Sequence, residues 1–166
     1  MNKICYLHLG LHKTASTSFQ STCKRNENLL KSFDITYPTF KCSAKNKNSV
    51  INHGIPICSL FHQEPKKAPV NIRWNICDKI DEINTSYNKQ LEEYLEESNN
   101  IILSGESIST LGKDEINKFI NKVKNYDYKV KALALVRRPY AFYCSSIQEM
   151  VKKGQYKKRG GKINSR

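Results

Sequence analysis

At 166 residues the chain has the length of one domain with a real hydrophobic core, but it is short for a doubly wound enzyme. Lysine and arginine number 28 against 15 acidic residues, so the formal net charge is +13. From Arg137 to Arg166 there are nine cations and one acid, which gives that end +8. This balance favours an anionic partner such as a nucleotide, an acidic glycan or nucleic acid. A general drift of composition toward lysine and asparagine is the alternative explanation.

The cysteines and the N-terminal segment indicate the compartment. Six cysteines are widely spaced, with no Cys-x-x-Cys pair. The apolar run after Lys3 contains His8 and lacks a small-residue cleavage site, and no stretch approaches the roughly 20 apolar residues of a membrane span. We therefore expect reduced, mostly buried thiols in a cytoplasmic protein without a membrane span. A zinc site built from cysteines with His53 and His62 lacks ligand spacing, and we expect no metal.

The first predicted unit is a strand, a turn and a helix. Ile4–Leu9 is apolar and too short for a helix, and Gly10 ends it. Thr17 and Gln20 have the spacing of a capping box, which predicts a helix from about Ser18 to Leu30. The turn between them holds one cation and several hydroxyls, in Lys13, Thr14, Ser16, Thr17 and Ser18. Free N–H groups, the helix dipole and the lysine charge would converge there, which predicts an anion site; an ordinary capped turn with a solvated lysine is the alternative.

The middle of the chain, Phe33 to Pro69, is interrupted by prolines and by Gly54, and it is expected to be a functional loop or to contain short helices. His53 lies in this segment, in the sequence Asn-His-Gly. A loop histidine that caps local structure is the favoured interpretation.

The second half alternates helices and strands. Apolar residues recur at intervals of three and four over Ile76–Leu95 and again over Asp114–Lys124, which predicts amphipathic helices. Ile101–Leu103 is the second predicted strand, with Glu106 just beyond its end. Val130–Val136 is the third, and its nearly continuous apolar run is typical of a parallel strand covered on both faces. The alternation predicts an α/β fold with a short parallel sheet flanked by helices.

A second polar stretch follows the third strand. Arg137 comes at the carboxyl end of that strand, where ligands bind in open α/β sheets. Pro139 suits the first residue of a helix, and Ser145 follows about two turns later. Arginine is well suited to bidentate phosphate recognition, which favours a phosphate site here. The alternative is that these arginines only project into solvent at the end of the strand.

Residues His8–Gln20 resemble the 5′-phosphosulfate loop of the sulfotransferase family that uses 3′-phosphoadenosine 5′-phosphosulfate. Ala15 stands where this family usually has glycine, and alanine is strained if its backbone is left-handed there. A Walker A loop is excluded, because only Gly10 precedes Lys13.

The spacing of Arg137, Pro139 and Ser145 resembles the 3′-phosphate motif of the same family, particularly its bacterial and Golgi-type members. The resemblance implies a P-loop-like three-layer domain over residues 1–154, incomplete at its C-terminal end relative to the family. Residues 155–166 are expected to form a basic, disordered tail.

The resemblance also implies roles for individual residues. The turn after the first strand would hold the 5′-phosphosulfate, and Arg137 and Ser145 would hold the 3′-phosphate. Lys13 would stabilise the charge on the oxygen that bridges phosphate and sulfate. Glu106 is the candidate base for a hydroxyl or amine of a glycan or other metabolite, although it is as readily interpreted as a capping or solvated carboxylate. His53 is the alternative base, because a histidine occurs in this region of bacterial members of the family. In the turn after the first strand, the resemblance implies that the residues that bind the cofactor are Gly10, Lys13, Thr14, Ala15, Ser16 and Thr17.

Two other functions remain open. A truncated relative would at most bind the nucleotide without turnover. A basic nucleic-acid-binding module is disfavoured, because no helix-turn-helix, RRM or zinc-finger pattern is present. A magnesium-dependent kinase is disfavoured as well, because no Walker pattern is present and no predicted strand ends in aspartate.

Overall fold

The computed structural model describes residues 3–10, 14–42, 47–152 and 154. Short 3-10 helices accompany the main elements, at η2 (Pro65–Lys67), η3 (Cys77–Lys79) and η4 (Glu106–Thr110). The main elements in chain order are β1 (Lys3–Gly10), α1 (Ser16–Arg25), α2 (Glu27–Ser32), β2 (Ile35–Thr36), β3 (Phe40–Cys42), β4 (Lys47–Val50), α3 (Gly54–Phe61), α4 (Pro69–Trp74), α5 (Ile80–Glu97), β5 (Asn100–Ser104), α6 (Lys113–Lys124), β6 (Tyr128–Leu135) and α7 (Pro139–Lys152).

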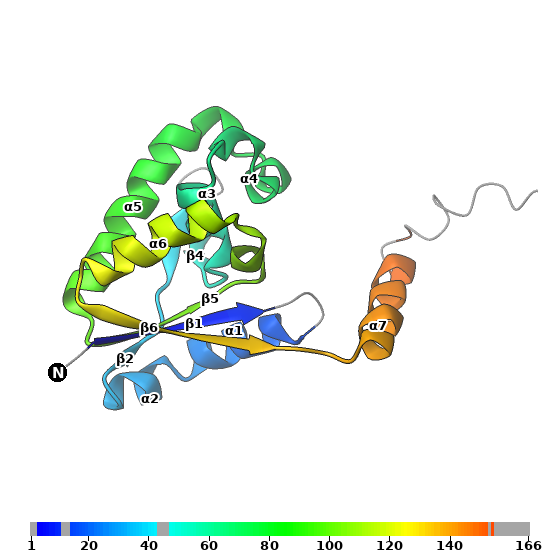
Figure 1. Cartoon of the computed structure of the whole chain (residues 1–166), viewed down its shortest axis with the longest axis horizontal. Coiled ribbons are helices and arrows are strands. Elements are labelled where there is room, and N and C mark those ends of the chain that lie inside the picture. The colour runs from blue at the N-terminus through cyan, green and yellow to red at the C-terminus, as the bar shows by residue number, and fades with distance from the viewer. Residues whose placement is uncertain (1–2, 11–13, 43–46, 153, 155–166) are drawn as a thin grey trace, which may run out of the picture.

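A four-stranded parallel sheet forms the middle layer, in the order β2-β5-β1-β6. Helices α1 and α2 lie on one face of the sheet, and α3, α5 and α6 lie on the other (Figure 1). The predicted α/β class, with a short parallel sheet between helices, is confirmed. The predicted tail, residues 155–166, lies outside the described residues. No helix in the described ranges is both long and apolar enough to cross a membrane.

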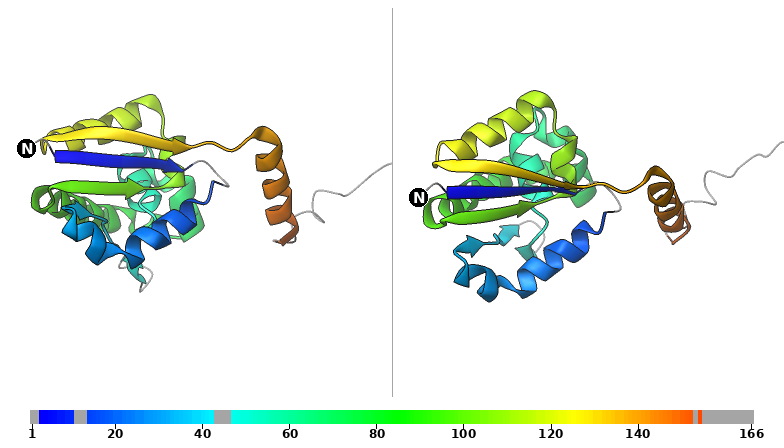
Figure 2. Two further views of the ribbon diagram at one scale, coloured as in Figure 1. Left: turned by 90° about the horizontal axis from the view of Figure 1, so that it is seen from below. Right: turned by 60° about the horizontal axis from the view of Figure 1, so that its bottom comes forward.

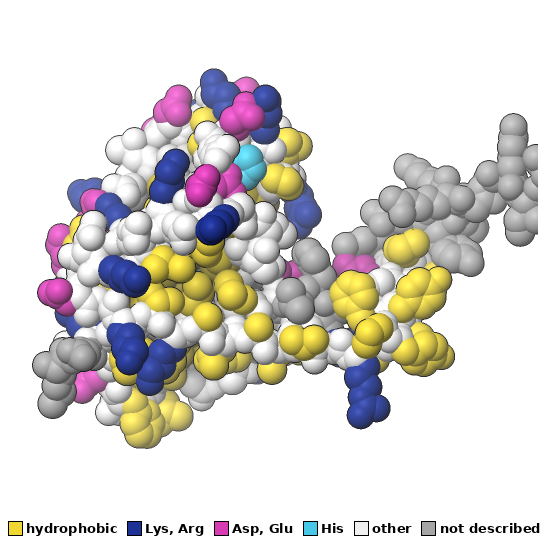
Figure 3. Space-filling model, viewed as in Figure 1, with side chains coloured by type: hydrophobic (Ala, Val, Ile, Leu, Met, Phe, Trp, Pro, Cys, Tyr) yellow, Lys and Arg dark blue, Asp and Glu magenta, His cyan; other side chains and the backbone are white. Residues whose placement is uncertain are grey.

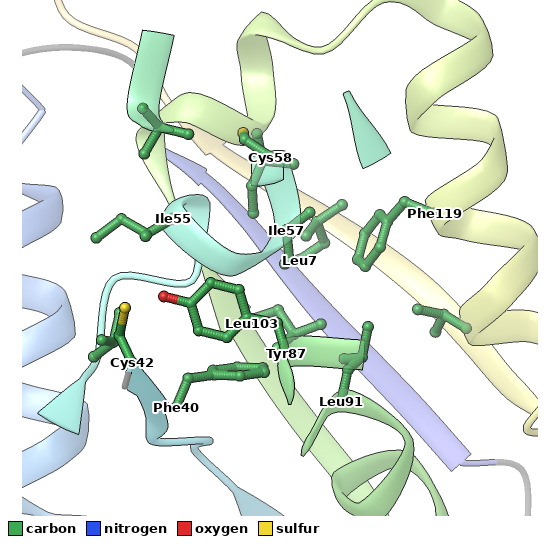
Figure 4. Close-up of a cluster of buried hydrophobic side chains, with 14 of the residues drawn as sticks. Leu7, Phe40, Cys42, Ile55, Ile57, Cys58, Tyr87, Leu91, Leu103 and Phe119 are labelled. Carbon is green, nitrogen blue, oxygen red and sulfur yellow. The ribbon is translucent and has the colours of Figure 1, made fainter. Parts of the chain in front are cut away.

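The main core lies between the sheet and the layer of α3, α5 and α6. Leu7 of β1 and Leu103 of β5 point toward this layer, where Ile57 of α3, Tyr87 of α5 and Phe119 of α6 meet them (Figure 4). The periodic apolar residues of the predicted helices account for this packing, because residues three and four apart share one helix face. In α5 the buried residues are Ile80, Ile83, Tyr87, Leu91 and Leu95.

Helix α3 begins directly against the carboxyl end of β5. A Cβ added to Gly105 would lie 2.1 Å from the nitrogen of Gly54, so backbone packs on backbone at this point. Residues 54–59 of α3 are all buried. The middle segment therefore contains a core helix, together with β2 and the antiparallel β3–β4 pair.

The single helix predicted from Ser18 to Leu30 is in fact two helices, α1 and α2, separated at Asn26. The Asn26 side chain donates to the carbonyl oxygen of Thr22 at 2.8 Å, and its backbone N–H reaches the same oxygen at 3.1 Å. Asparagine competes in this way for backbone groups and so favours helix ends.

The prediction that Val130–Val136 is covered on both faces is wrong. Strand β6 forms one edge of the sheet, and every residue from Lys131 to Leu135 is exposed. Helix α6 covers only the start of the strand, where Tyr128 is buried. Helix α7, which follows β6, stands clear of the rest of the molecule in two further views (Figure 2).

Candidate functional site

Three neighbouring parallel strands, β5, β1 and β6, have their carboxyl ends on the same side of the molecule, and the candidate residues follow these ends. Strand β1 lies between β5 and β6, with His8 opposite Ser104 and Gly10 opposite Leu135. Glu106 therefore comes two residues after the end of β5, and Arg137 comes two residues after the end of β6. The two candidate motifs therefore start from adjacent strand ends.

Ser16 and Glu106 both approach Gly10 closely. A Cβ built on Gly10 would lie 2.0 Å from the Ser16 hydroxyl oxygen and 3.4 Å from Cγ of Glu106. A side chain at residue 10 would thus occupy the space of the Ser16 hydroxyl. Glycine at the end of β1 allows the first turn of α1 and the Glu106 side chain to approach the same point.

The first turn of α1 is not closed by a side chain. Ala15 is the N-cap residue, and no side-chain cap is present within the described residues. The predicted capping box of Thr17 and Gln20 is therefore wrong: the helix begins at Ser16, and the Gln20 amide is directed to Ser104 instead. The first N–H groups of a helix have no partner within the helix itself.

Ala15 adopts a left-handed backbone, with φ 62° and ψ 24°. The other described non-glycine residues with positive φ are Asp34, Asn75 and Asp127, which are residue types that tolerate this region. Alanine has no side-chain hydrogen bond to offset the strain. Glycine adopts this left-handed conformation freely and alanine does not, so strain is held at the candidate site.

The polar groups of this turn suit an anion. The Ser16 side chain is 1% exposed, and its hydroxyl oxygen has no hydrogen-bond partner within the described part of the chain. The first turn of α1 contains no acidic residue. The positive end of the helix dipole and N–H groups without a helical partner favour a phosphate-like group at this position.

Behind the turn, Ser104 at the end of β5 joins several elements. Its hydroxyl lies 2.8 Å from Nδ1 of His8 on β1, and the Gln20 amide of α1 donates to its carbonyl oxygen at 3.4 Å. The backbone N–H of Ser104 donates to Nδ1 of His53 at 2.8 Å, and the N–H of His53 donates back to the Ser104 carbonyl oxygen at 2.8 Å. Strands β1 and β5 and helices α1 and α3 are thereby fixed relative to one another.

His53 is a structural residue and is excluded as the base. It is fully buried, with Nδ1 accepting from Ser104 and Nε2 donating to the carbonyl oxygen of Pro38 at 2.8 Å. These contacts hold the neutral tautomer, and desolvation by burial lowers the pKa of His53 to about 4. The favoured interpretation of a histidine that caps local structure is wrong, because among the described residues its side chain bonds to residues distant in the chain and makes no cap on α3. Glu106 remains the candidate base.

The remaining predicted residues are placed as follows. Thr14 is buried and Thr17 is exposed beside Ser16, while Lys13 lies outside the described residues. Arg137 is exposed in the connection after β6. Ser145 lies on α7, which projects past the strand ends and stands clear of the sheet (Figure 2). The structure thus brings Gly10, Ser16 and Glu106 together and leaves Ser145 on a separate element.

Sequence reasoning missed Ser104, His8 and Gln20 as the residues that brace the site. His8 and Ser104 each sit within a short strand, and only the strand register makes them neighbours. No local pattern could have indicated this pairing.

The thiols match the expectation of mostly buried side chains. Cys5, Cys23, Cys42 and Cys58 are buried and all six cysteines are free. Desolvation raises the pKa of Cys5 and of Cys58 to about 12, which keeps both thiols protonated near neutral pH. Within the described ranges, no group of three or more His, Cys, Asp or Glu side chains could hold a metal ion.

Comparison with known proteins finds no matching family model, no similar curated protein and no similar solved structure.

The strain at Ala15 gives a first prediction. Ala15→Gly should raise the free energy of unfolding by roughly 0.5–1 kcal/mol, because relief of the left-handed strain exceeds the extra chain entropy of glycine. The corresponding rise in the melting temperature is about 1–4 °C. Ala141→Gly, in the first turn of α7, is the control and should give no stabilisation. A lower melting temperature for Ala15→Gly would contradict the left-handed turn.

Burial of neutral His53 gives a second prediction. The pKa of His53 is lower in the folded chain than in the unfolded chain, so the unfolded state binds more protons below about pH 6.5. The free energy of unfolding therefore decreases as the pH is lowered. Between pH 7 and pH 5 the loss should be about 2 kcal/mol, taking 6.5 as the unfolded value. Urea unfolding of the wild type and of His53→Gln measures it, and the variant should show a much flatter dependence. Equal pH dependence in the two proteins would show that His53 is not buried in the neutral form.

Proposed function

We propose that the chain binds 3′-phosphoadenosine 5′-phosphosulfate and transfers its sulfuryl group to a hydroxyl or amine of a glycan or other metabolite. The observation that carries the proposal is the approach of two groups to Gly10 at the start of α1: the Ser16 hydroxyl, which has no partner among the described residues, and Glu106. An anion-binding turn and a carboxylate at a single point are what transfer of an anionic group to a neutral acceptor requires. The motif resemblance supplies the identity of the anion.

The first turn of α1 would hold the 5′-phosphosulfate. The N–H groups of Ser16 and Thr17 have no helical partner, and the Ser16 hydroxyl lies beside them. We call these N–H groups and the Ser16 hydroxyl the anion cradle. Its groups are in place without a ligand, because Gly10 leaves room for the Ser16 side chain. Preorganised donors of this kind stabilise charge without reorganisation during the reaction.

The proposed reaction exchanges one bond to sulfur for another. The acceptor oxygen bonds to sulfur while the bond between sulfur and the bridging phosphate oxygen breaks, which leaves adenosine 3′,5′-bisphosphate. The acceptor proton passes to the carboxylate of Glu106. The ammonium group of Lys13 would stabilise the negative charge that develops on the bridging oxygen.

Arg137 and Ser145 would hold the 3′-phosphate. Arg137 lies just beyond Leu135, which pairs with Gly10, and so starts from the strand next to the cradle. Because α7 stands clear of the sheet, Ser145 would need α7 to move toward the site. This placement favours one second candidate, a relative that binds the nucleotide through the cradle and Arg137 but does not turn over.

Ligand stabilisation tests the nucleotide site. Adenosine 3′,5′-bisphosphate at 100 times its Kd should add ~2.7 kcal/mol to stability, or roughly 5–11 °C in melting temperature. Adenosine 5′-monophosphate should give a much smaller shift. Arg137→Ala should abolish the difference between the two nucleotides, whereas Arg73→Ala, an exposed arginine on α4, should preserve it.

Equal shifts with both nucleotides, or no shift with either, would contradict the proposed site. Double-stranded DNA provides the comparison with a nucleic-acid binder. A nucleic-acid module would be stabilised by DNA at low salt and would lose that stabilisation steeply as salt rises.

Turnover tests the assigned roles. Glu106→Gln should lower the rate of radiolabelled sulfuryl transfer to glycans by about 10²–10⁴-fold with little change in nucleotide affinity, because the amide cannot accept the proton. Lys13→Ala should lower it by about 10²–10³-fold. Glu82→Gln on α5 is the matched control and should leave the rate unchanged. Full activity in Glu106→Gln would remove Glu106 as the base. Nucleotide binding without transfer in the wild type would favour the second candidate.

A further inference from the structure

The carboxyl-terminal half of β6 presents two leucines on a face that no described helix covers, whereas Lys131 on the same face marks the start of a charged half. Leu133 and Leu135 pair with His8 and Gly10, and paired residues of parallel strands point to the same face. His8 packs on Phe19 of α1, with ring centroids 4.4 Å apart, so this is the face on which α1 lies. Leu133 is nevertheless 54% exposed and Leu135 53% exposed. Helices α1 and α2 lie under the other strands (Figure 2).

Helix α7 carries an apolar stripe whose residues are exposed or half-buried. Tyr140, Tyr143, Cys144, Ile147 and Val151 recur at intervals of three and four and share one side of the helix. Tyr140 is 81% exposed and Tyr143 63% exposed. The space-filling view shows large apolar side chains gathered on α7 (Figure 3).

The two surfaces complement each other. In α/β folds a helix normally covers each face of a strand in the sheet, and α7 is the helix that follows β6. Among the described residues, no helix covers this face of β6 and the stripe of α7 packs on no sheet (Figure 2). Contiguous exposed apolar surface of this kind marks an interaction site.

The connection between β6 and α7 directs the helix outward. It comprises Val136, Arg137 and Arg138, and Pro139 restricts the residue before it to extended conformations. Helix α7 therefore continues past the strand ends (Figure 1). In this conformation α7 can reach the β6 face of another molecule but does not fold back on its own.

We propose that two copies of this chain form a symmetric dimer in which α7 of each copy packs its apolar stripe on the exposed face of β6 of the other. Exchange of an identical element is a low-cost route to a dimer, and it satisfies both surfaces in both copies. Tyr140 and Tyr143 on α7, with Leu133 and Leu135 on β6, contribute twice. At ~150–250 Å² for each aromatic side chain the four tyrosines supply about 600–1,000 Å², and the aliphatic side chains of the two contacts bring the interface to the lower end of the roughly 1,200–2,000 Å² of a stable dimer.

Charge opposes this association. Each chain carries a formal net charge of +13, so two copies repel each other. The dimer is held by apolar contact and should strengthen as salt screens the repulsion. An association driven by ion pairs would show the opposite dependence.

Sedimentation equilibrium of the full chain over a wide range of concentration tests the dimer, and the wild type should sediment as a dimer. Tyr143→Lys on α7 and Leu135→Lys on β6 should each raise the dissociation constant by about tenfold or more, because each places a charge in both apolar contacts. Leu29→Lys, at a residue 57% exposed on α2, is the matched control and should leave the dimer unchanged. A monomeric wild type, or a dimer insensitive to both variants, would overturn the proposal.

A mixing experiment tests the exchange itself. A Tyr143→Lys copy retains an intact β6 face and a Leu135→Lys copy retains an intact α7, so a mixture should form a heterodimer through one undamaged contact. Its dissociation constant should lie between those of the wild type and of either variant alone. A mixture no tighter than the separate variants would contradict the exchange of α7.

Cross-linking provides a measurement that does not depend on destabilising variants. Leu133→Cys should form a disulfide with Cys144 of a second copy under a mild oxidant, giving a covalent dimer that Cys144→Ser removes. Ile72→Cys, at a residue 59% exposed on α4, is the control and should give no such product. A disulfide formed within one chain would show that α7 folds back on its own sheet, and this too would overturn the proposal.

Discussion

The Ser16 hydroxyl occupies the space in which a side chain at residue 10 would lie, only 2.0 Å from the position of its Cβ. Strand β1 must therefore end in glycine for α1 to begin this close to the sheet. The same contact brings Glu106 of the neighbouring strand to the start of α1, because β5 ends beside β1. The geometry of the candidate site follows from this one close approach.

The two sides of this contact differ in how well their polar groups are satisfied. On the inner side, toward the sheet, Ser104 is hydrogen-bonded to His8, His53 and Gln20, and these bonds fix the ends of β1 and β5 relative to each other. On the outer side, the buried hydroxyl of Ser16 has no partner among the described residues, and Ala15 is held in a left-handed conformation. Buried polar groups are usually hydrogen-bonded, so an unpaired one beside a helix N-terminus is a reason to expect a ligand.

The sequence predicted the elements whose pattern is local. The periodicity of α5 and α6 and the short apolar runs of β1 and β5 identified the α/β fold. Pro139 correctly marked the start of α7. The break at Asn26 was missed, because it depends on competition between a side chain and the backbone that helix propensity alone does not register. The two-residue strand β2 is too short to show any period.

Other features could not be predicted because they depend on residues far apart in the chain. The apolar run of β6 predicts a covered strand, but its place at the edge is decided by which strands pair. His53 is fixed as a neutral histidine by Ser104 and Pro38, which no spacing rule connects to it. The position of Ser145 depends on the direction of α7, so a motif that matches in sequence can still have its residues apart in space.

The most direct test of the account is to locate the nucleotide on the folded chain. In an amide NMR titration with adenosine 3′,5′-bisphosphate, the account predicts that the largest shifts fall on Ser16, Thr17 and Ser18, with smaller shifts at Arg137. Saturable shifts confined to these residues would place the anion in the turn beside Gly10. Shifts spread over the exposed lysines of α5 and α6, with the amides of residues 16–18 unmoved, would contradict it.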